Sequence, residues 1–166
     1  MQIVLKISCF IIVSVLVSCG HQGTGKCTET NISTKTRASH NGGRDCARCH
    51  QQGNDARGCF TVCGTVFKSD LSTPMSDAVM VLLSRDVNDW TKITGVSKPI
   101  PVDKTGNFYT TESIDFVGKY PAIIKNGDTI AMSSPLDATA SCNSCHSSGK
   151  ESQLGSQGVI YDNIIK

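Results

Sequence analysis

The sequence predicts a mainly β fold, a single antiparallel β-sandwich over residues 60–132. From Phe60 onward, short β-branched and aliphatic runs are separated by turn residues at intervals of roughly ten residues, which is typical of sandwiches and barrels. The pair Asn126-Gly127 is a hairpin signal between two of these runs. No segment shows the 3.6-residue apolar periodicity of an amphipathic helix.

The runs predict six strands in this region. Residues 78–83 carry apolar side chains at successive positions, as a central strand buried on both faces does. Residues 98–103 contain Pro99 and Pro101, which require an edge position or irregular pairing. The remaining strands are expected at residues 60–67, 107–111, 119–125 and 128–132.

The order of these landmarks resembles the carboxypeptidase regulatory-like, transthyretin-like sandwich. The matching features are the opening strand at residues 62–66, the segment 74–79 before the central strand, the turn at 103–108 and the hairpin from Tyr120 to Gly127. The resemblance covers residues 60–132 and implies a seven- or eight-stranded β-sandwich. Such domains seldom carry catalysis, so the fold by itself says little about function.

The N-terminus reads as an export signal. Lys6 precedes an almost wholly apolar stretch at residues 7–17, which is too short to span a bilayer as a helix. The sequence Leu16-Val17-Ser18-Cys19 resembles a bacterial lipobox, which implies cleavage after residue 18 and a diacylglycerol thioether on Cys19. An ordinary signal peptide cut elsewhere, or a short anchor, is the alternative. The expected location is therefore the bacterial cell envelope, on the periplasmic face or at the outer membrane.

Two cysteine motifs carry the chemistry. Residues 46–50 read Cys-Ala-Arg-Cys-His and residues 142–146 read Cys-Asn-Ser-Cys-His, and both fit the attachment pattern of c-type haem. In this pattern two thiols on one turn add across the haem vinyl groups, and the adjacent histidine ligates the iron. The sequence therefore predicts two covalent haems. Their attachment residues are Cys46, Cys49, Cys142 and Cys145, and the proximal ligands are His50 and His146.

Other uses of these cysteines are less well supported. A four-cysteine zinc site would not explain a histidine after both pairs. A thioredoxin-like redox pair needs a βαβ context that the sequence lacks, and disulfides within Cys-x-x-Cys loops are strained and uncommon.

The motifs divide the chain into five segments. We expect a signal peptide at residues 1–18, a flexible tether at 19–39 and a first haem-binding segment at 40–59. The β-sandwich follows at 60–132, and a second haem-binding segment with a tail occupies 133–166. The tether is expected because residues 20–45 are polar and small, with Ile32 as the only large aliphatic residue.

The sixth iron ligands are harder to assign. The string from Ser39 to His50 resembles the haem segment of small dihaem cytochromes, and this implies His40 as the distal ligand of the first haem. Two alternatives remain open: His40 is a solvated loop histidine, or it ligates the iron of the second haem. Met132 is the best thioether candidate for the second haem, because Met75 and Met80 lie where packing is the expected role.

Three further cysteines remain in the mature chain. Cys59 and Cys63 are four residues apart in extended chain, so their Cα atoms are too far apart for a disulfide. Either could pair with Cys27. We expect the pair Cys27–Cys59, with Cys63 buried and free in the strand.

These features together favour a membrane-anchored dihaem cytochrome for electron transfer, with periplasmic or outer-membrane redox proteins as partners. No nucleophile–base motif, phosphate loop or paired-carboxylate pattern indicates an enzyme, and a net charge of +2 does not suggest nucleic-acid binding. One rival is a haem redox enzyme or gas sensor with an open iron site. Another is a haem-carrying structural subunit of a larger cytochrome complex.

Overall fold

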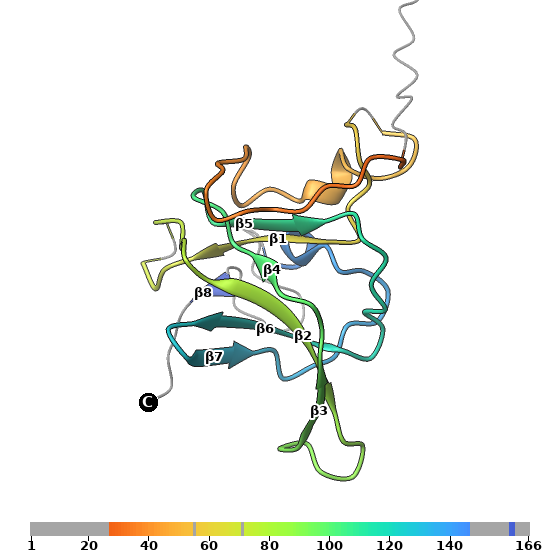
Figure 1. The fold of residues 1–166 in the computed structure, drawn as a ribbon, viewed down its shortest axis with the longest axis vertical. Coiled ribbons are helices and arrows are strands. Elements are labelled where there is room, and N and C mark those ends of the chain that lie inside the picture. The colour runs from red at the N-terminus through yellow and green to blue at the C-terminus, as the bar shows by residue number, and fades with distance from the viewer. Residues whose placement is uncertain (1–26, 55, 71, 147–159, 162–166) are drawn as a thin grey trace, which may run out of the picture.

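The described residues form two β-sheets with an apolar core between them (Figure 1). This computed structural model describes residues 27–54, 56–70, 72–146 and the backbone of 160–161. In chain order the elements are η1 (Cys46–Arg48), β1 (Val62–Phe67), β2 (Val79–Arg85), β3 (Ile93–Val96), β4 (Ile100–Pro101), β5 (Asn107–Thr110), β6 (Tyr120–Lys125), β7 (Asp128–Ala131), η2 (Cys142–Ser144) and β8 (Ile160–Tyr161). The two η elements are single 3₁₀ turns. The mainly β prediction is confirmed.

The smaller sheet has the strand order β5-β1-β8, and the larger has β3-β2-β6-β7 with β4 also paired to β2. All pairings are antiparallel except that of β1 with β8, which is parallel. The hairpin predicted at Asn126-Gly127 joins β6 to β7, with Asn126 at φ 53° and Gly127 at φ 91°. These positive φ values explain the choice of asparagine and glycine.

The core forms where the two sheets face each other. Val62 and Val66 alternate along β1 to point inward, and Met80 and Leu82 do the same along β2. Gly64 lies between the two valines on the inward face of β1, and the ring of Phe108 and the side chain of Cys142 occupy the space a larger residue would fill. The first cysteine of the second motif is therefore packed into the core.

The predicted strands are found at slightly shifted bounds, and two strands, β3 and β8, were not predicted. β3 was missed because it is an exposed strand. Ile93 and Val96 are each at least half exposed, so the strand shows no alternation between buried and solvent-facing residues. The proline-containing run at 98–103 shortens to Ile100–Pro101, which pairs with β2 outside the main path of the sheet. This is the irregular pairing that its prolines require.

Residues 19–39 were predicted to be a flexible tether. The structure describes this segment from Cys27 onward, and there it is packed against the sheet. Ile32 forms a β-bridge with Thr110, and the amide of Ser33 donates to the carbonyl of Tyr109 at 2.9 Å. The Ser33 side chain is fully buried and donates to the carbonyl of Pro101 at 2.6 Å. Backbone pairing to the edge of β5 holds this segment, so it needs few apolar side chains.

The predicted signal peptide, the lipidation site Cys19 and most of the predicted tail lie outside the described residues. Within the part of the chain that is described, no helix has the length and hydrophobicity needed to cross a membrane.

Candidate haem sites

Both cysteine motifs fold into the same turn. In each motif the amides of the second cysteine and of the histidine donate to the carbonyl of the first cysteine, at 3.1 and 2.9 Å in the first motif and 3.2 and 2.8 Å in the second. The second cysteines adopt nearly equal backbone angles, φ −112° and ψ −36° for Cys49 and φ −106° and ψ −39° for Cys145. The two segments share only cysteine and histidine at matched positions, yet they have one local structure.

The two turns lie against the same strand, β1. The amide of Cys63 in β1 donates to the carbonyl of Ala140 at 3.0 Å, just before the second motif. The hydroxyl of Ser141 donates to the Asp45 carboxylate at 2.5 Å, and that carboxylate also accepts from the amide of Ala47 at 3.1 Å. Asp45 is thus the N-cap of the first turn and a direct link to the second motif. The capping role of an aspartate before a short helical turn can be predicted from sequence. The contact of Asp45 with Ser141 cannot.

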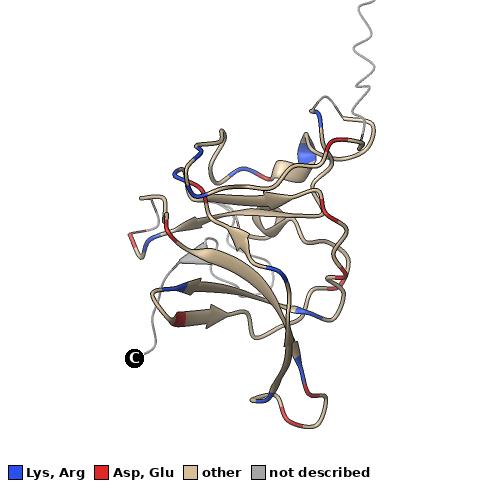
Figure 2. Cartoon of the chain, in the orientation of Figure 1, with Lys and Arg blue, Asp and Glu red and all other residues tan. Residues whose placement is uncertain are grey.

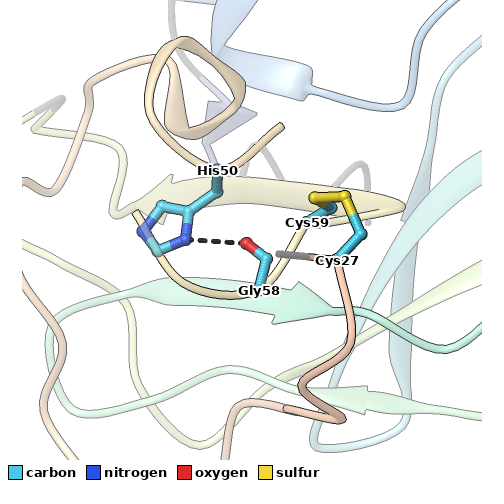
Figure 3. Close-up of a disulfide and its surroundings, with 4 residues drawn as sticks. All are labelled: Cys27, His50, Gly58 and Cys59. Carbon is cyan, nitrogen blue, oxygen red and sulfur yellow. Dashed lines mark hydrogen bonds between the residues drawn. A yellow bond between two sulfur atoms is a disulfide. The ribbon is translucent and has the colours of Figure 1, made fainter. Parts of the chain in front are cut away.

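His50 is oriented by the backbone of the loop that follows its motif. Its Nδ1 lies 3.2 Å from the carbonyl oxygen of Gly58 (Figure 3), and Nε2 makes no hydrogen bond within the described part of the chain. Histidines that bind metals usually donate their second ring nitrogen to a carbonyl or carboxylate, which fixes the ring and the tautomer. The arrangement suits Nε2 as an iron ligand.

An aromatic stack supports the same imidazole. The ring of Phe60 is stacked on His50 with centroids 4.0 Å apart, and Tyr109 is stacked on Phe60 at 4.6 Å. Desolvation raises the pKa of the half-buried Tyr109 phenol. Since Tyr109 belongs to β5, the stack ties the orientation of His50 to the small sheet.

His40 lies next to His50, with ring centroids 6.0 Å apart and planes 29° from parallel. The structure therefore brings together the two histidines that the sequence assigned to the first haem.

A buried polar network fixes the backbone beside His40. The carboxylate of Asp103, fully buried, accepts from the amide and hydroxyl of Ser39 at 3.0 and 2.5 Å and from the amide of Asn107 at 3.0 Å. The side-chain amide of Asn107 donates to the carbonyl of His40 at 3.1 Å, and its oxygen accepts from Thr65 at 2.6 Å. The sequence showed Asp103 only as a turn residue, and its contact with Ser39 depends on the fold.

The second motif is less accessible than the first. Cys142 is 7% exposed, whereas Cys145 and Cys49 are exposed and Cys46 is half-buried. Burial raises the pKa of the Cys142 thiol to about 12. Asn143 is also buried; its side-chain amide donates to the carbonyl of His146 at 3.0 Å, and its Oδ1 has no hydrogen-bond partner among the described residues. The turn matches the haem pattern, but the Cys142 thiol is enclosed by β1 and Phe108.

Met132 is not brought to the second motif by any contact found among the described residues. It follows β7 in the larger sheet, where its amide donates to the carbonyl of Pro121 at 2.8 Å and its side chain is half-buried. The η2 turn lies against β1 of the smaller sheet. Met75 and Met80 are fully buried in the core, in the packing role expected for them.

A disulfide joins Cys27 to Cys59, with Cα atoms 4.8 Å apart (Figure 3). This is the pairing that the sequence analysis favoured, and Cys63 is a buried free thiol, as expected. Cys59 adjoins Gly58, whose carbonyl orients His50. The bond therefore anchors both the N-terminal segment and the loop beneath the first histidine.

Removal of this disulfide should loosen the first site. We expect Cys27→Ser/Cys59→Ser to lower the free energy of unfolding by about 2–4 kcal/mol, because the bond closes a loop between residues 32 apart. Chemical denaturation followed by circular dichroism would measure the loss. Measured on the haem-free protein, Cys145→Ser, which changes an exposed cysteine outside this bond, is the control, and equal stability of the double variant and the wild type would contradict the anchoring role.

Comparisons with protein-family models, curated proteins and solved structures found no match to this chain. In the described part of the chain, no group of three or more His, Cys, Asp or Glu side chains is placed to hold a metal ion. A haem iron needs only one or two ligands from the protein, since the porphyrin supplies four.

Proposed function

We propose that this protein is a dihaem c-type cytochrome that transfers electrons in the bacterial cell envelope. The observation that carries the proposal is the shared turn: two Cys-x-x-Cys-His segments, far apart in sequence, have the same backbone hydrogen bonds from the second cysteine and the histidine to the first cysteine. In this proposal Cys46, Cys49, Cys142 and Cys145 form the thioether bonds, and His50 and His146 are the proximal ligands.

Haem supplies one-electron chemistry, and the protein sets its ligands, burial and position. At the first site, Gly58 and Phe60 hold the His50 ring, while the network on Asp103 and Asn107 keeps His40 beside it. A ligand pair held in this way changes little between oxidation states, which suits a carrier.

The link between Asp45 and Ser141 supports electron transfer between the two sites. Both motifs begin beside Cys63 on β1, so the groups they hold would lie close to one another. A short separation favours intramolecular transfer and makes the pair one functional unit.

The disulfide supports export, because such bonds persist in oxidising compartments. Together with the lipobox-like Leu16-Val17-Ser18-Cys19, it supports a protein held at the membrane by lipid on Cys19. Anchoring raises the effective concentration of membrane-associated redox partners. Figure 2 shows acidic and basic residues interspersed over the loops, without a broad face of one sign in that view.

The position of Met132 favours a second candidate function. Because Met132 follows β7 of the larger sheet whereas η2 lies against β1, none of the described methionines is placed beside the second motif, and an open iron position there would suit a haem redox enzyme or gas sensor. Carbon monoxide binding to the reduced wild type separates the two functions: a carrier with both irons six-coordinate does not take it up readily.

Two haem masses that survive denaturation are the expected result of mass spectrometry on the protein expressed with a c-type haem maturation system. Cys49→Ser and Cys145→Ser should each lose or weaken attachment at their own site only, because each removes one thioether. Ser144→Ala, inside the second motif but outside its thiols, is the matched control. A wild-type protein with one covalent haem, or none, would refute the proposal.

A further inference from the structure

Cys63 is a nucleophilic side chain that the proposed function does not use. It is fully buried at the second position of β1 and takes no part in the Cys27–Cys59 disulfide. Its alternation along β1 directs it away from the core valines Val62 and Val66, toward the face that the first motif covers.

The Cys63 thiol meets both cysteine motifs. It lies 3.5 Å from the hydroxyl of Ser141, which is bonded in turn to Asp45, the residue before Cys46. It also interacts with the thiol of Cys46 itself, and each thiol is the largest influence on the pKa of the other. A third thiol is thus held next to a cysteine that the first haem requires.

We propose that Cys63 and Cys46 form a disulfide in the haem-free protein, and that this bond withholds Cys46 from haem attachment. The second half rests on the proposed function, whereas the first half does not. The oxidant is a disulfide of the envelope, protein or small molecule. The S–S bond between Cys46 and Cys63 forms as the oxidant's own S–S bond breaks, and the two thiol protons pass to its two sulfurs.

The electrostatics of the pair agree with this chemistry. The hydrogen bond from Cys63 lowers the pKa of Cys46, while the same contact and burial raise the pKa of Cys63. The thiolate is the form that attacks a disulfide, so Cys46 is the attacking group and Cys63 resolves the mixed disulfide. Once Cys46 carries a thioether it can no longer pair, and Cys63 becomes a permanently free thiol.

The test uses the full chain, exported without a haem maturation system. The protein is denatured without reductant, treated with N-ethylmaleimide and mapped by mass spectrometry. We expect the wild type to lose labelling at both Cys46 and Cys63 and to yield a peptide pair joined by a disulfide. Cys63→Ser, which keeps the hydroxyl contact to Ser141, should restore full labelling at Cys46.

Cys49 and Cys145, which are exposed, should be labelled in both proteins, and Cys27–Cys59 should stay joined in both. Free thiols at Cys46 and Cys63 in the wild type, or a disulfide between Cys46 and Cys142 instead, would overturn the proposal.

A second arm tests the effect on haem. With a limiting maturation system, the fraction of chains carrying haem on the first motif should be higher for Cys63→Ser than for wild type. Equal fractions would overturn the withholding role. Absence of haem from every variant, with the Cys46–Cys63 disulfide present in the haem-free chain, would instead reject the proposed function alone.

Discussion

Replacing His40 with alanine should convert the first haem from six-coordinate and low-spin to five-coordinate and high-spin. The reason is that His40 is the only imidazole that the described structure places beside His50. The ferrous variant should bind about one equivalent of carbon monoxide, where the parent site binds little, because the open position accepts a small ligand. Electron paramagnetic resonance of the oxidised protein and a carbon monoxide difference spectrum would measure both changes.

Added imidazole provides a direct control for this variant. It should restore the low-spin signal of His40→Ala, since it supplies the missing ligand without repairing the loop. Met132→Ala, on the other sheet, should leave the first haem unchanged. A spectrum of His40→Ala identical to that of the wild type would show that another group ligates the first iron. Carbon monoxide uptake by the unmodified protein at one haem would point to the open-site enzyme or sensor.

Replacing Gly64 with alanine should be the most damaging small substitution in β1. A Cβ atom at this position would lie 2.6 Å from Phe108 Cζ and 2.9 Å from the Cβ atom of Cys142, distances that real contacts do not reach. Overpacking of this kind costs about 1–3 kcal/mol. At this chain length that corresponds to a fall in Tm of roughly 2–12 °C, which differential scanning calorimetry on the haem-free protein would detect.

Gly95→Ala is the matched control, because a Cβ atom there comes no closer than 3.4 Å to Ser84. It lies in β3 and should change stability by less than about 0.5 kcal/mol. Gly64→Ala should also increase maleimide labelling of Cys142 in the folded state, since the second motif must move away from β1. If both variants melt alike, Cys142 is not packed as described.

The sequence allowed the mainly β class to be predicted because alternation and turn chemistry are local signals. β1, β2, β5, β6 and β7 were all found within two residues at either end by such signals. β3 escaped because exposed strands carry no burial pattern. The order at residues 27–39 escaped because it depends on backbone hydrogen bonds to β5, which hydropathy does not report.

The candidate sites divide in the same way. The two motifs, the pairing of Cys27 with Cys59 and the role proposed for His40 followed from spacing and from resemblance. The contact of Cys63 with Cys46, the link from Asp45 to Ser141 and the burial of Cys142 did not, because each joins positions whose proximity is set by strand register. Sequence specified the chemical groups, and the fold determined which of them meet.

The covering of the smaller sheet has a consequence for solubility. Residues 31–33 pair along the outer edge of β5, and residues 140–141 pair with the opposite edge of β1 at Cys63. An uncovered strand edge offers free amides and carbonyls to strands of other chains and so promotes aggregation. Here the polypeptide leading into each cysteine motif protects one edge. If the two motif segments detach, the chain exposes two unpaired strand edges. Protection from aggregation therefore depends on the same segments that are proposed to carry the haems.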